Sequence, residues 1–136
     1  QLACLLHTGD VVLLSGDVGA GQTQFARSLI LPLLDTPEAI PSPTFTLVQT
    51  YDSARGAIWH ADLYRLTSTY EIEELGLIDA FHEAICLVEW PDRLGPLIPA
   101  GALHLTLCAA EGDESREITA EWDAGDWAEK LAGWQR

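Results

Sequence analysis

A glycine-rich loop between an apolar run and an amphipathic segment is the feature that most constrains this chain. Residues 11–14 (VVLL) form an uninterrupted apolar run, which is typical of a strand buried on both faces. Residues 16–21 then contain three glycines, and residues 23–34 place their apolar side chains on one helical face. That face consists of Phe25, Ala26, Leu29, Ile30 and Leu33. A buried strand, a tight loop and a helix in this order predict an α/β fold.

The loop has the spacing of a phosphate-binding motif. Residues 16–23 read GDVGAGQT, against the pattern G-x-x-x-x-G-K-[ST]. In that motif backbone N–H groups surround a phosphate at a helix N-terminus, and a hydroxyl, here that of Thr23, is offered to Mg²⁺. Gln22 stands where the motif has lysine, and the missing charge-assisted contact is worth about 1.5–3 kcal/mol, or roughly 10–150-fold in triphosphate affinity. The alternative is a glycine-rich strand-to-helix turn that binds nothing.

The rest of the chain mixes strands with helices. The segments predicted as further strands are residues 44–51, 57–62, 85–88, 103–107 and 118–122. Residues 52–56 are the expected turn between the first two, and the last two suggest a hairpin. Ser68 and Glu71 form a capping-box pattern that opens a helix closed by Gly76, and a last helix is predicted over 124–135. Together these elements predict a three-layer α/β sheet with some antiparallel pairs.

Acidic side chains follow or end two of the predicted strands. Glu89 comes directly after the apolar run 85–88, where an acid would hold Mg²⁺ or its water. An ordinary solvated glutamate at a strand end would give the same sequence pattern. Asp62 is a candidate for orienting an attacking or metal-bound water; alternatively it caps the next turn or pairs with Arg65. His60 alternates with Asp62 and is expected on the same face, although a lone histidine is more often structural.

Composition excludes several classes of function. The chain has 136 residues, enough for one domain, and carries 21 acidic against 7 basic residues, a formal net charge of −14. That charge argues against autonomous nucleic-acid binding and against an anionic membrane surface, and no apolar run approaches the ~18 residues of a membrane span. Cys86 and Cys108 lie in apolar runs and are expected to be buried thiols in a reducing cytoplasm. The cysteines and histidines lack metal-ligand spacing, so no structural zinc is expected.

Five ordered segments resemble the bacterial TsaE (YjeE) family, small P-loop ATPases of tRNA threonylcarbamoyladenosine biosynthesis. The matching segments are residues 14–25 (LSGDVGAGQTQF), 42–51 (SPTFTLVQTY), 60–66 (HADLYRL), 73–77 (EELGL) and 84–93 (AICLVEWPDR). They span residues 11–93 in the family's order, and the last third of the chain matches loosely. Five ordered motifs are far more specific than one glycine-rich loop.

The resemblance implies a P-loop fold with a mixed parallel and antiparallel sheet, in one nucleotide-binding domain over residues 1–136. It also implies binding of ATP or ADP with Mg²⁺ and slow ATP hydrolysis, in support of the TsaB–TsaD complex that modifies adenosine 37 of tRNA. The positions that would cradle the phosphates are Gly19, Ala20, Gly21, Gln22, Thr23 and Gln24. Thr23 and Glu89 take the magnesium positions, and Glu89 and Asp62 are the implied catalytic acids. Trp90 would lie near the nucleotide or the partner surface.

Two residues depart from the family's pattern, which has Lys-Thr-Thr where this chain has Gln22-Thr23-Gln24. Either catalysis is weakened in this protein, or the sequence is an engineered or erroneous variant. Two functional hypotheses therefore stand: a slow Mg-dependent ATPase, and a catalytically weakened or inactive interaction module of the same complex. By the same resemblance, the family's N-terminal strand and part of its first helix are absent from residues 1–136.

Overall fold

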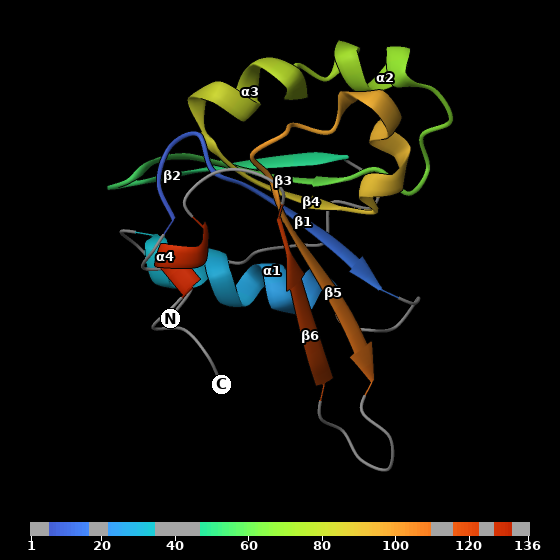
Figure 1. Cartoon of the computed structure of the whole chain (residues 1–136). Coiled ribbons are helices and arrows are strands. Elements are labelled where there is room, and N and C mark those ends of the chain that lie inside the picture. Colours follow the sequence, from blue (N-terminus) through green and yellow to red (C-terminus); the bar gives the residue numbers. More distant parts are fainter. Residues whose placement is uncertain (1–5, 17–21, 35–46, 110–115, 123–126, 132–136) are drawn as a thin grey trace.

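A computed structural model describes residues 6–16, 22–34, 47–109, 116–122 and 127–131, and its centre is one mixed sheet. The six strands lie in the order β2-β3-β4-β1-β5-β6 (Figure 1). Their bounds are β1 Val11–Gly16, β2 Val48–Ser53, β3 Gly56–Asp62, β4 Ile85–Glu89, β5 Leu103–Ala109 and β6 Arg116–Glu121.

The four central strands are parallel, and the two outer pairs are antiparallel. β1 pairs with β4 and β5 in parallel, β4 pairs with β3 in parallel, and β2 and β6 run antiparallel to β3 and β5. The sheet is therefore mixed, as the sequence predicts. The parallel pairing brings the carboxyl ends of β1, β3 and β4 to one edge of the sheet, so residues that follow these strands become neighbours.

Helices cover both faces of the sheet, which confirms the three-layer prediction (Figure 1). On one face lie α1 (Gln22–Ile30), its 3₁₀ extension η2 (Leu31–Leu33) and α4 (Trp127–Leu131). On the other lie α2 (Thr69–Glu74), α3 (Leu77–Glu83) and the 3₁₀ segment η3 (Pro91–Leu97). None of the helices in these described segments is long and apolar enough to cross a membrane.

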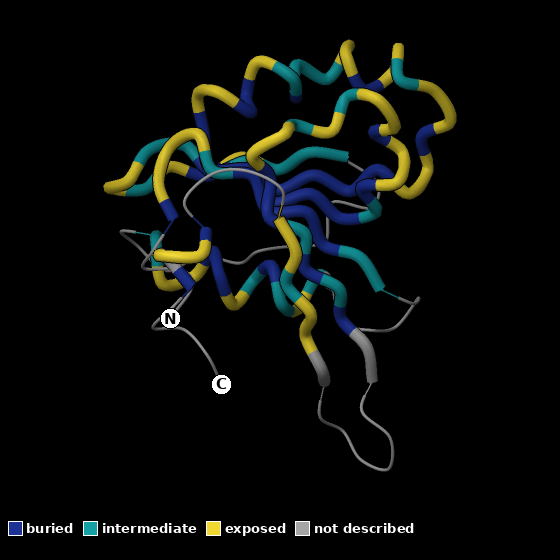
Figure 2. Tube along the Cα trace, in the orientation of Figure 1, coloured by how far each residue is buried: buried dark blue, intermediate teal, exposed yellow. Residues whose placement is uncertain are grey.

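The core consists of two apolar layers, one on each side of β1 and β4. Val12, Leu14 and Leu87 pack with α1 and α4, whereas Leu13 and Val88 pack with α2 and α3. Both strands are buried along their apolar runs, and Figure 2 shows this as the dark blue centre of the sheet. The apolar runs in the sequence are thus strands buried on both faces, as predicted.

Several boundaries differ from those predicted. Residues 44–46 lie outside the described residues. β2 begins at Val48, because Leu47 has a φ of +71° and is not part of the strand, and it continues to Ser53. The hairpin turn is consequently shorter than 52–56, and Gly56 closes it with φ of +114°. The first helix starts at Gln22 and changes to 3₁₀ geometry at Leu31, because Pro32 cannot donate the next helical hydrogen bond.

The capping box is present as predicted. Ser68 Oγ accepts from the backbone N–H of Glu71, and Glu71 Oε1 accepts from that of Ser68. Gly76 follows α2 in the left-handed conformation, with φ of +80°, and α3 begins at the next residue. The sequence pattern did not predict α3 as a helix separate from α2. Residues of the last predicted helix other than Trp127–Leu131 lie outside the described part of the chain.

Cys86 is a buried free thiol, as expected, and donates from Sγ to the Ala80 carbonyl oxygen at 3.3 Å. Burial raises the pKa of the Cys86 thiol to about 12, so the thiol is held protonated and unreactive. The side chain of Cys108 and all of Cys4 lie outside the described residues.

Candidate functional site

The carboxylate of Glu89, at the end of β4, is the centre of the candidate site. Glu89 is 2% exposed, and two side chains donate to it. Thr23 Oγ1 lies 2.9 Å from Oε1 and 3.0 Å from Oε2 of this carboxylate. His60 Nε2 lies 2.6 Å from Oε2. Three residues that are far apart in the sequence therefore meet at one buried carboxylate.

Sheet register and helix placement explain this meeting. Glu89 is level with Leu14 on β1 and with Asp62 on β3, and His60 is level with Leu87. Because side chains alternate along a strand, His60, Asp62 and Glu89 all point to the face that α1 covers. Thr23 is the second residue of α1, so its hydroxyl reaches the sheet edge from the helix start.

Asp62 is buried next to Glu89 in register, and its carboxylate also holds the backbone. Asp62 Oδ1 accepts from the backbone N–H of Tyr64 at 3.0 Å, which fixes the turn that follows β3. The turn-capping role weighed from the sequence is therefore present. The side chain is 4% exposed and sits at the carboxyl edge of the sheet, so a role in chemistry at Glu89 is compatible with the same position.

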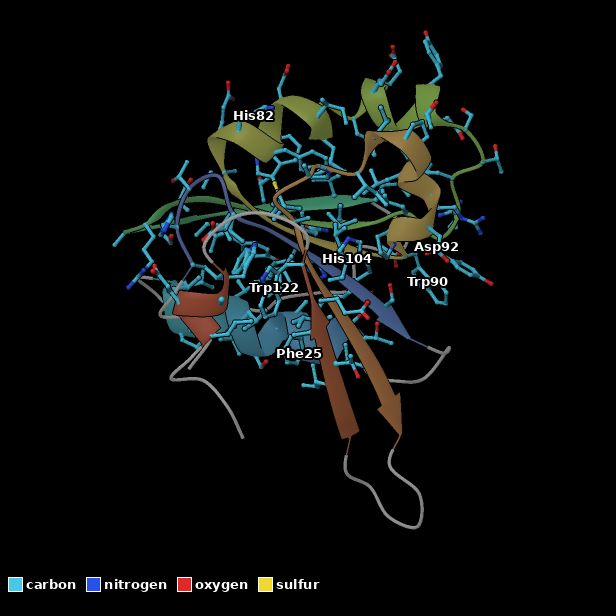
Figure 3. The ribbon with its side chains drawn as sticks, viewed as in Figure 1. Phe25, His82, Trp90, Asp92, His104 and Trp122 are labelled. Atoms are coloured by element: carbon cyan, nitrogen blue, oxygen red, sulfur yellow. The ribbon has the colours of Figure 1, made fainter. Side chains whose placement is uncertain are left out.

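Trp90, directly after Glu89, takes an unusual backbone conformation. Its φ is +59° and its ψ is +55°, in the left-handed region that large side chains rarely occupy. Its ring packs against Tyr64 with 4.9 Å between centroids, and Arg93 Nη2 donates to the Tyr64 carbonyl oxygen at 3.0 Å. Figure 3 shows Trp90 and Asp92 together beside the carboxyl edge of the sheet, away from His82 on α3.

The phosphate-loop positions are only partly within the described residues. Gly19, Ala20 and Gly21 lie outside them, as do residues 42–46. Gln22 begins α1, but its side chain is outside the described part as well. Gln24 is exposed in the first turn of the helix, and Thr23 is half-buried against Glu89. Of the predicted site residues, the structure thus brings together Thr23, Asp62 and Glu89.

Sequence reasoning did not find two features of this site. One is the packing of Tyr64 on Trp90 with Arg93 beside them, because no sequence pattern distinguishes these three residues from ordinary surface residues. The contact between His60 and Glu89 follows from parallel register between β3 and β4, which a single sequence does not reveal. The period-two alternation of His60 and Asp62 was the available signal, and it placed His60 on the correct face.

The oxygen atoms at this edge suit a hard divalent cation. A threonine hydroxyl and a carboxylate are ligands that Mg²⁺ takes in nucleotide sites, where phosphates and water complete its shell. Within the described ranges, no group of three or more histidine, cysteine, aspartate or glutamate side chains is arranged to hold a metal ion by itself. The Thr23 hydroxyl and the Glu89 carboxylate are donors of the kind that fits a cation shared with a phosphate ligand.

Comparison with known proteins shows what the chain is similar to. A family model described as "Threonylcarbamoyl adenosine biosynthesis protein TsaE" matches residues 1–118. The chain is 39% identical over 112 residues to a tRNA threonylcarbamoyladenosine biosynthesis protein TsaE of Rickettsia bellii, covering 82% of this chain and 78% of the relative. It is 38% identical over 118 residues to the Bacillus subtilis protein of that name, covering 86% and 72%.

A solved structure agrees with these sequence matches. The crystal structure of Bacillus subtilis YdiB superposes with a TM-score of 0.68 and 31% identity, over 90% of this chain and 74% of that one. The fold is the P-loop NTPase-like α/β fold with a mixed sheet that the sequence predicted. On the family match, the curated relatives and this fold, the chain belongs to the TsaE family of tRNA threonylcarbamoyladenosine biosynthesis proteins.

Proposed function

We propose that this protein binds Mg·ATP and Mg·ADP at the carboxyl edge of its sheet and hydrolyses ATP slowly. In this proposal the nucleotide cycle supports threonylcarbamoylation of adenosine 37 of tRNA by a TsaB–TsaD complex in the cytoplasm. The family match supports the pathway, and the side chains at the sheet edge support the proposed nucleotide chemistry. The observation that carries the proposal is the buried Glu89 carboxylate with the Thr23 hydroxyl within 3.0 Å of both its oxygens.

Thr23 and Glu89 would hold the magnesium ion. A hydroxyl at a helix start and an acid at the end of the neighbouring parallel strand form the usual Mg²⁺ arrangement of P-loop proteins. Bound there, Mg²⁺ would neutralise charge on the phosphate oxygens of the nucleotide. The proposed phosphate cradle consists of the loop and first helical turn: Gly19, Ala20, Gly21, Gln22, Thr23 and Gln24.

Asp62 is proposed to orient the attacking water. Its carboxylate is fixed by the Tyr64 N–H, so it would present the same orientation throughout a reaction. It lies level with Glu89 on the adjacent strand, so both carboxylates are at the same edge of the sheet. Glu89 would then bind the metal ion, and Asp62 would position the water.

One observation favours a second function, that of a non-catalytic interaction module of the same complex. Gln22 occupies the position of the motif's lysine, and a neutral amide can donate a hydrogen bond but brings no positive charge to the charge that develops during phosphoryl transfer. The acidic chain, with its net charge of −14, would still dock on a basic partner surface. This alternative predicts complex formation with TsaB–TsaD and no phosphate release at saturating ATP.

Calorimetry with ADP and phosphate release with ATP, each with and without Mg²⁺ and the partner complex, separate the two functions. The proposal predicts saturable Mg-dependent binding that tightens roughly 10–150-fold in Gln22→Lys, because a charged donor returns to the loop. Glu89→Ala is expected to abolish the Mg²⁺ dependence. Partner-stimulated phosphate release supports the ATPase, and its absence in both the native chain and Gln22→Lys would leave only the interaction module.

Glu83→Gln is the matched control for charge. Glu83 is exposed at the end of α3, on the opposite face of the sheet from α1 (Figure 1). Its substitution changes the net charge by the same amount as loss of Glu89 but leaves the site intact. A similar loss of Mg²⁺ dependence in Glu83→Gln and Glu89→Ala would mean that overall charge, not the Glu89 site, governs binding.

A further inference from the structure

The imidazole of His60 is fully buried, with a relative exposure of 0%, and only one of its two nitrogens has a partner within the described part of the chain. Nε2 lies 2.6 Å from Glu89 Oε2, which is short for a nitrogen–oxygen hydrogen bond. Nδ1 is buried and has no hydrogen-bond partner among the described residues. A carboxylate oxygen accepts, so Nε2 carries the proton and donates to Glu89.

We infer that His60 is a positioning residue that fixes the Glu89 carboxylate for divalent metal binding. The inference rests on the proposed function, because Glu89 is the proposed magnesium ligand. Metal-ligating groups are regularly held by hydrogen bonds from residues that do not touch the metal, and these bonds set ligand orientation. His60 occupies that role here from a strand interior, where its backbone is fixed by pairing with β2 and β4.

The geometry assigns different tasks to the two donors at Glu89. Thr23 Oγ1 is within 3.0 Å of both carboxylate oxygens, so it is placed to share a cation with either. His60 contacts Oε2 alone, from the side of β3, and thereby fixes the rotation of the carboxyl plane. Oε2 is thus shared between His60 and Thr23, whereas Oε1 has no contact with the ring and would be the oxygen more open to a metal ion.

A purely structural role is the competing explanation, and it makes a different prediction. A buried histidine that served only packing would tolerate an apolar side chain of similar size without specific loss at the metal. The neighbours level with His60 are Leu87 on β4 and Gln49 on β2, so apolar packing is available on one side. The site instead retains a polar ring whose second nitrogen is left without a described partner, and such burial costs free energy.

The test measures the Mg²⁺ dissociation constant at saturating ADP and the ADP dissociation constant in EDTA, for three variants of the full chain. His60→Leu removes the donor, and we expect it to raise the Mg²⁺ Kd about 10–100-fold while ADP binding in EDTA is unchanged. His60→Gln places an amide N–H at the same number of bonds from Cβ and should restore Mg²⁺ binding to within about threefold of the native value. His104→Gln is the control, a half-buried histidine of β5 on the other face of the sheet (Figure 3).

Two results would overturn the inference. If His60→Leu binds Mg²⁺ as tightly as the native chain, His60 does not position the ligand. If His60→Leu weakens ADP binding in EDTA as much as it weakens Mg²⁺ binding, the loss is one of general structure. Absence of Mg²⁺ binding in the native chain would instead remove the proposed function, and the hydrogen bond is then tested without metal.

That metal-free test is nitrogen-15 NMR of the histidine side chains. We expect a proton on His60 Nε2 that exchanges slowly with solvent, and expect its resonance to shift or vanish in Glu89→Ala. The resonance should stay in place in Glu83→Gln, in which an exposed glutamate far from the ring is changed. A His60 Nε2 without a proton, or a resonance that Glu89→Ala leaves unmoved, would contradict the donor role.

Discussion

Replacing Thr23 by valine removes one hydroxyl and keeps the branched shape of the side chain. In the native structure that hydroxyl lies 2.9 and 3.0 Å from the two oxygens of Glu89. A hydroxyl has one hydrogen, so the two distances describe one donated bond shared between two acceptors. A hydrogen bond to a charged acceptor contributes about 1.5–3 kcal/mol, and the half-buried position of Thr23 favours the lower end.

We therefore expect Thr23→Val to lower the free energy of unfolding by about 1.5 kcal/mol. With an urea slope of about 1.5–2 kcal/mol per molar for a domain of this size, the urea midpoint should fall by about 0.75–1 M. Valine has nearly the helix propensity of threonine, so the loss is not attributable to α1 itself. Equilibrium unfolding followed by far-UV circular dichroism gives both the midpoint and the slope.

A double-mutant cycle with Glu89→Leu isolates the contact. His60 loses its partner in both variants that contain Glu89→Leu, so this cost cancels from the cycle. The remaining coupling between positions 23 and 89 should be about 1–1.5 kcal/mol in favour of the native pair. A coupling near zero would refute the reasoning. It would mean that the hydroxyl and the carboxylate contribute independently to the free energy of unfolding, and that Glu89 does not anchor the start of α1 to β4.

Three further outcomes follow from described contacts. Ser68→Ala should cost about 1 kcal/mol of unfolding free energy in urea titrations, because the N-cap oxygen of α2 is lost, with Mg·ADP affinity unchanged. Gly56→Ala should cost about 1–3 kcal/mol by the same assay, because φ is +114° and an added Cβ would lie 2.7 Å from Thr8 Oγ1. Because the pKa of buried Cys86 is raised to about 12, its contribution to stability is complete below pH ~9 and is lost as pH rises towards 12. Unfolding titrations from pH 8 to 11 should therefore show the native chain losing stability more steeply than Cys86→Ala, and parallel pH profiles would contradict this.

Much of the scaffold was predictable because local signals agreed with the fold. The apolar runs at 11–14 and 85–88 are buried strands, and Ser68 with Glu71 caps α2 as the pattern indicated. The placement of Thr23 and Glu89 at one edge also followed, because parallel strands bring their carboxyl ends together. The strands and the cap followed from residues near one another in the sequence, and the meeting of Thr23 with Glu89 followed from the general geometry of parallel strands.

Other features depend on tertiary contacts that local sequence does not encode. α3 has only seven residues, and its separation from α2 depends on the left-handed Gly76 rather than on a change of apolar period. Trp90 adopts a positive φ against the preference of a large side chain, and its packing on Tyr64 accompanies that conformation. The contact of His60 with Glu89 spans 29 residues and needs the register between β3 and β4.

The burial of two carboxylates side by side is the step that connects fold to function. Asp62 and Glu89 are level on neighbouring strands, and both are at most 4% exposed. Thr23 and His60 contact the Glu89 carboxylate, and the Tyr64 N–H donates to Asp62. Paired strands lie about 4.8 Å apart, and ionised carboxylates on neighbouring strands repel each other. A sheet selected for stability alone would place apolar side chains at these two positions. It does so two residues earlier on the same face of β4, at Leu87. In the proposed function, a divalent cation that enters with a nucleotide would offset such repulsion, and its binding free energy would add to the stability of the native state. The two buried carboxylates therefore support the proposed ligand site. In that proposal Gln22 would affect how tightly the phosphates bind rather than whether the sheet edge takes a cation.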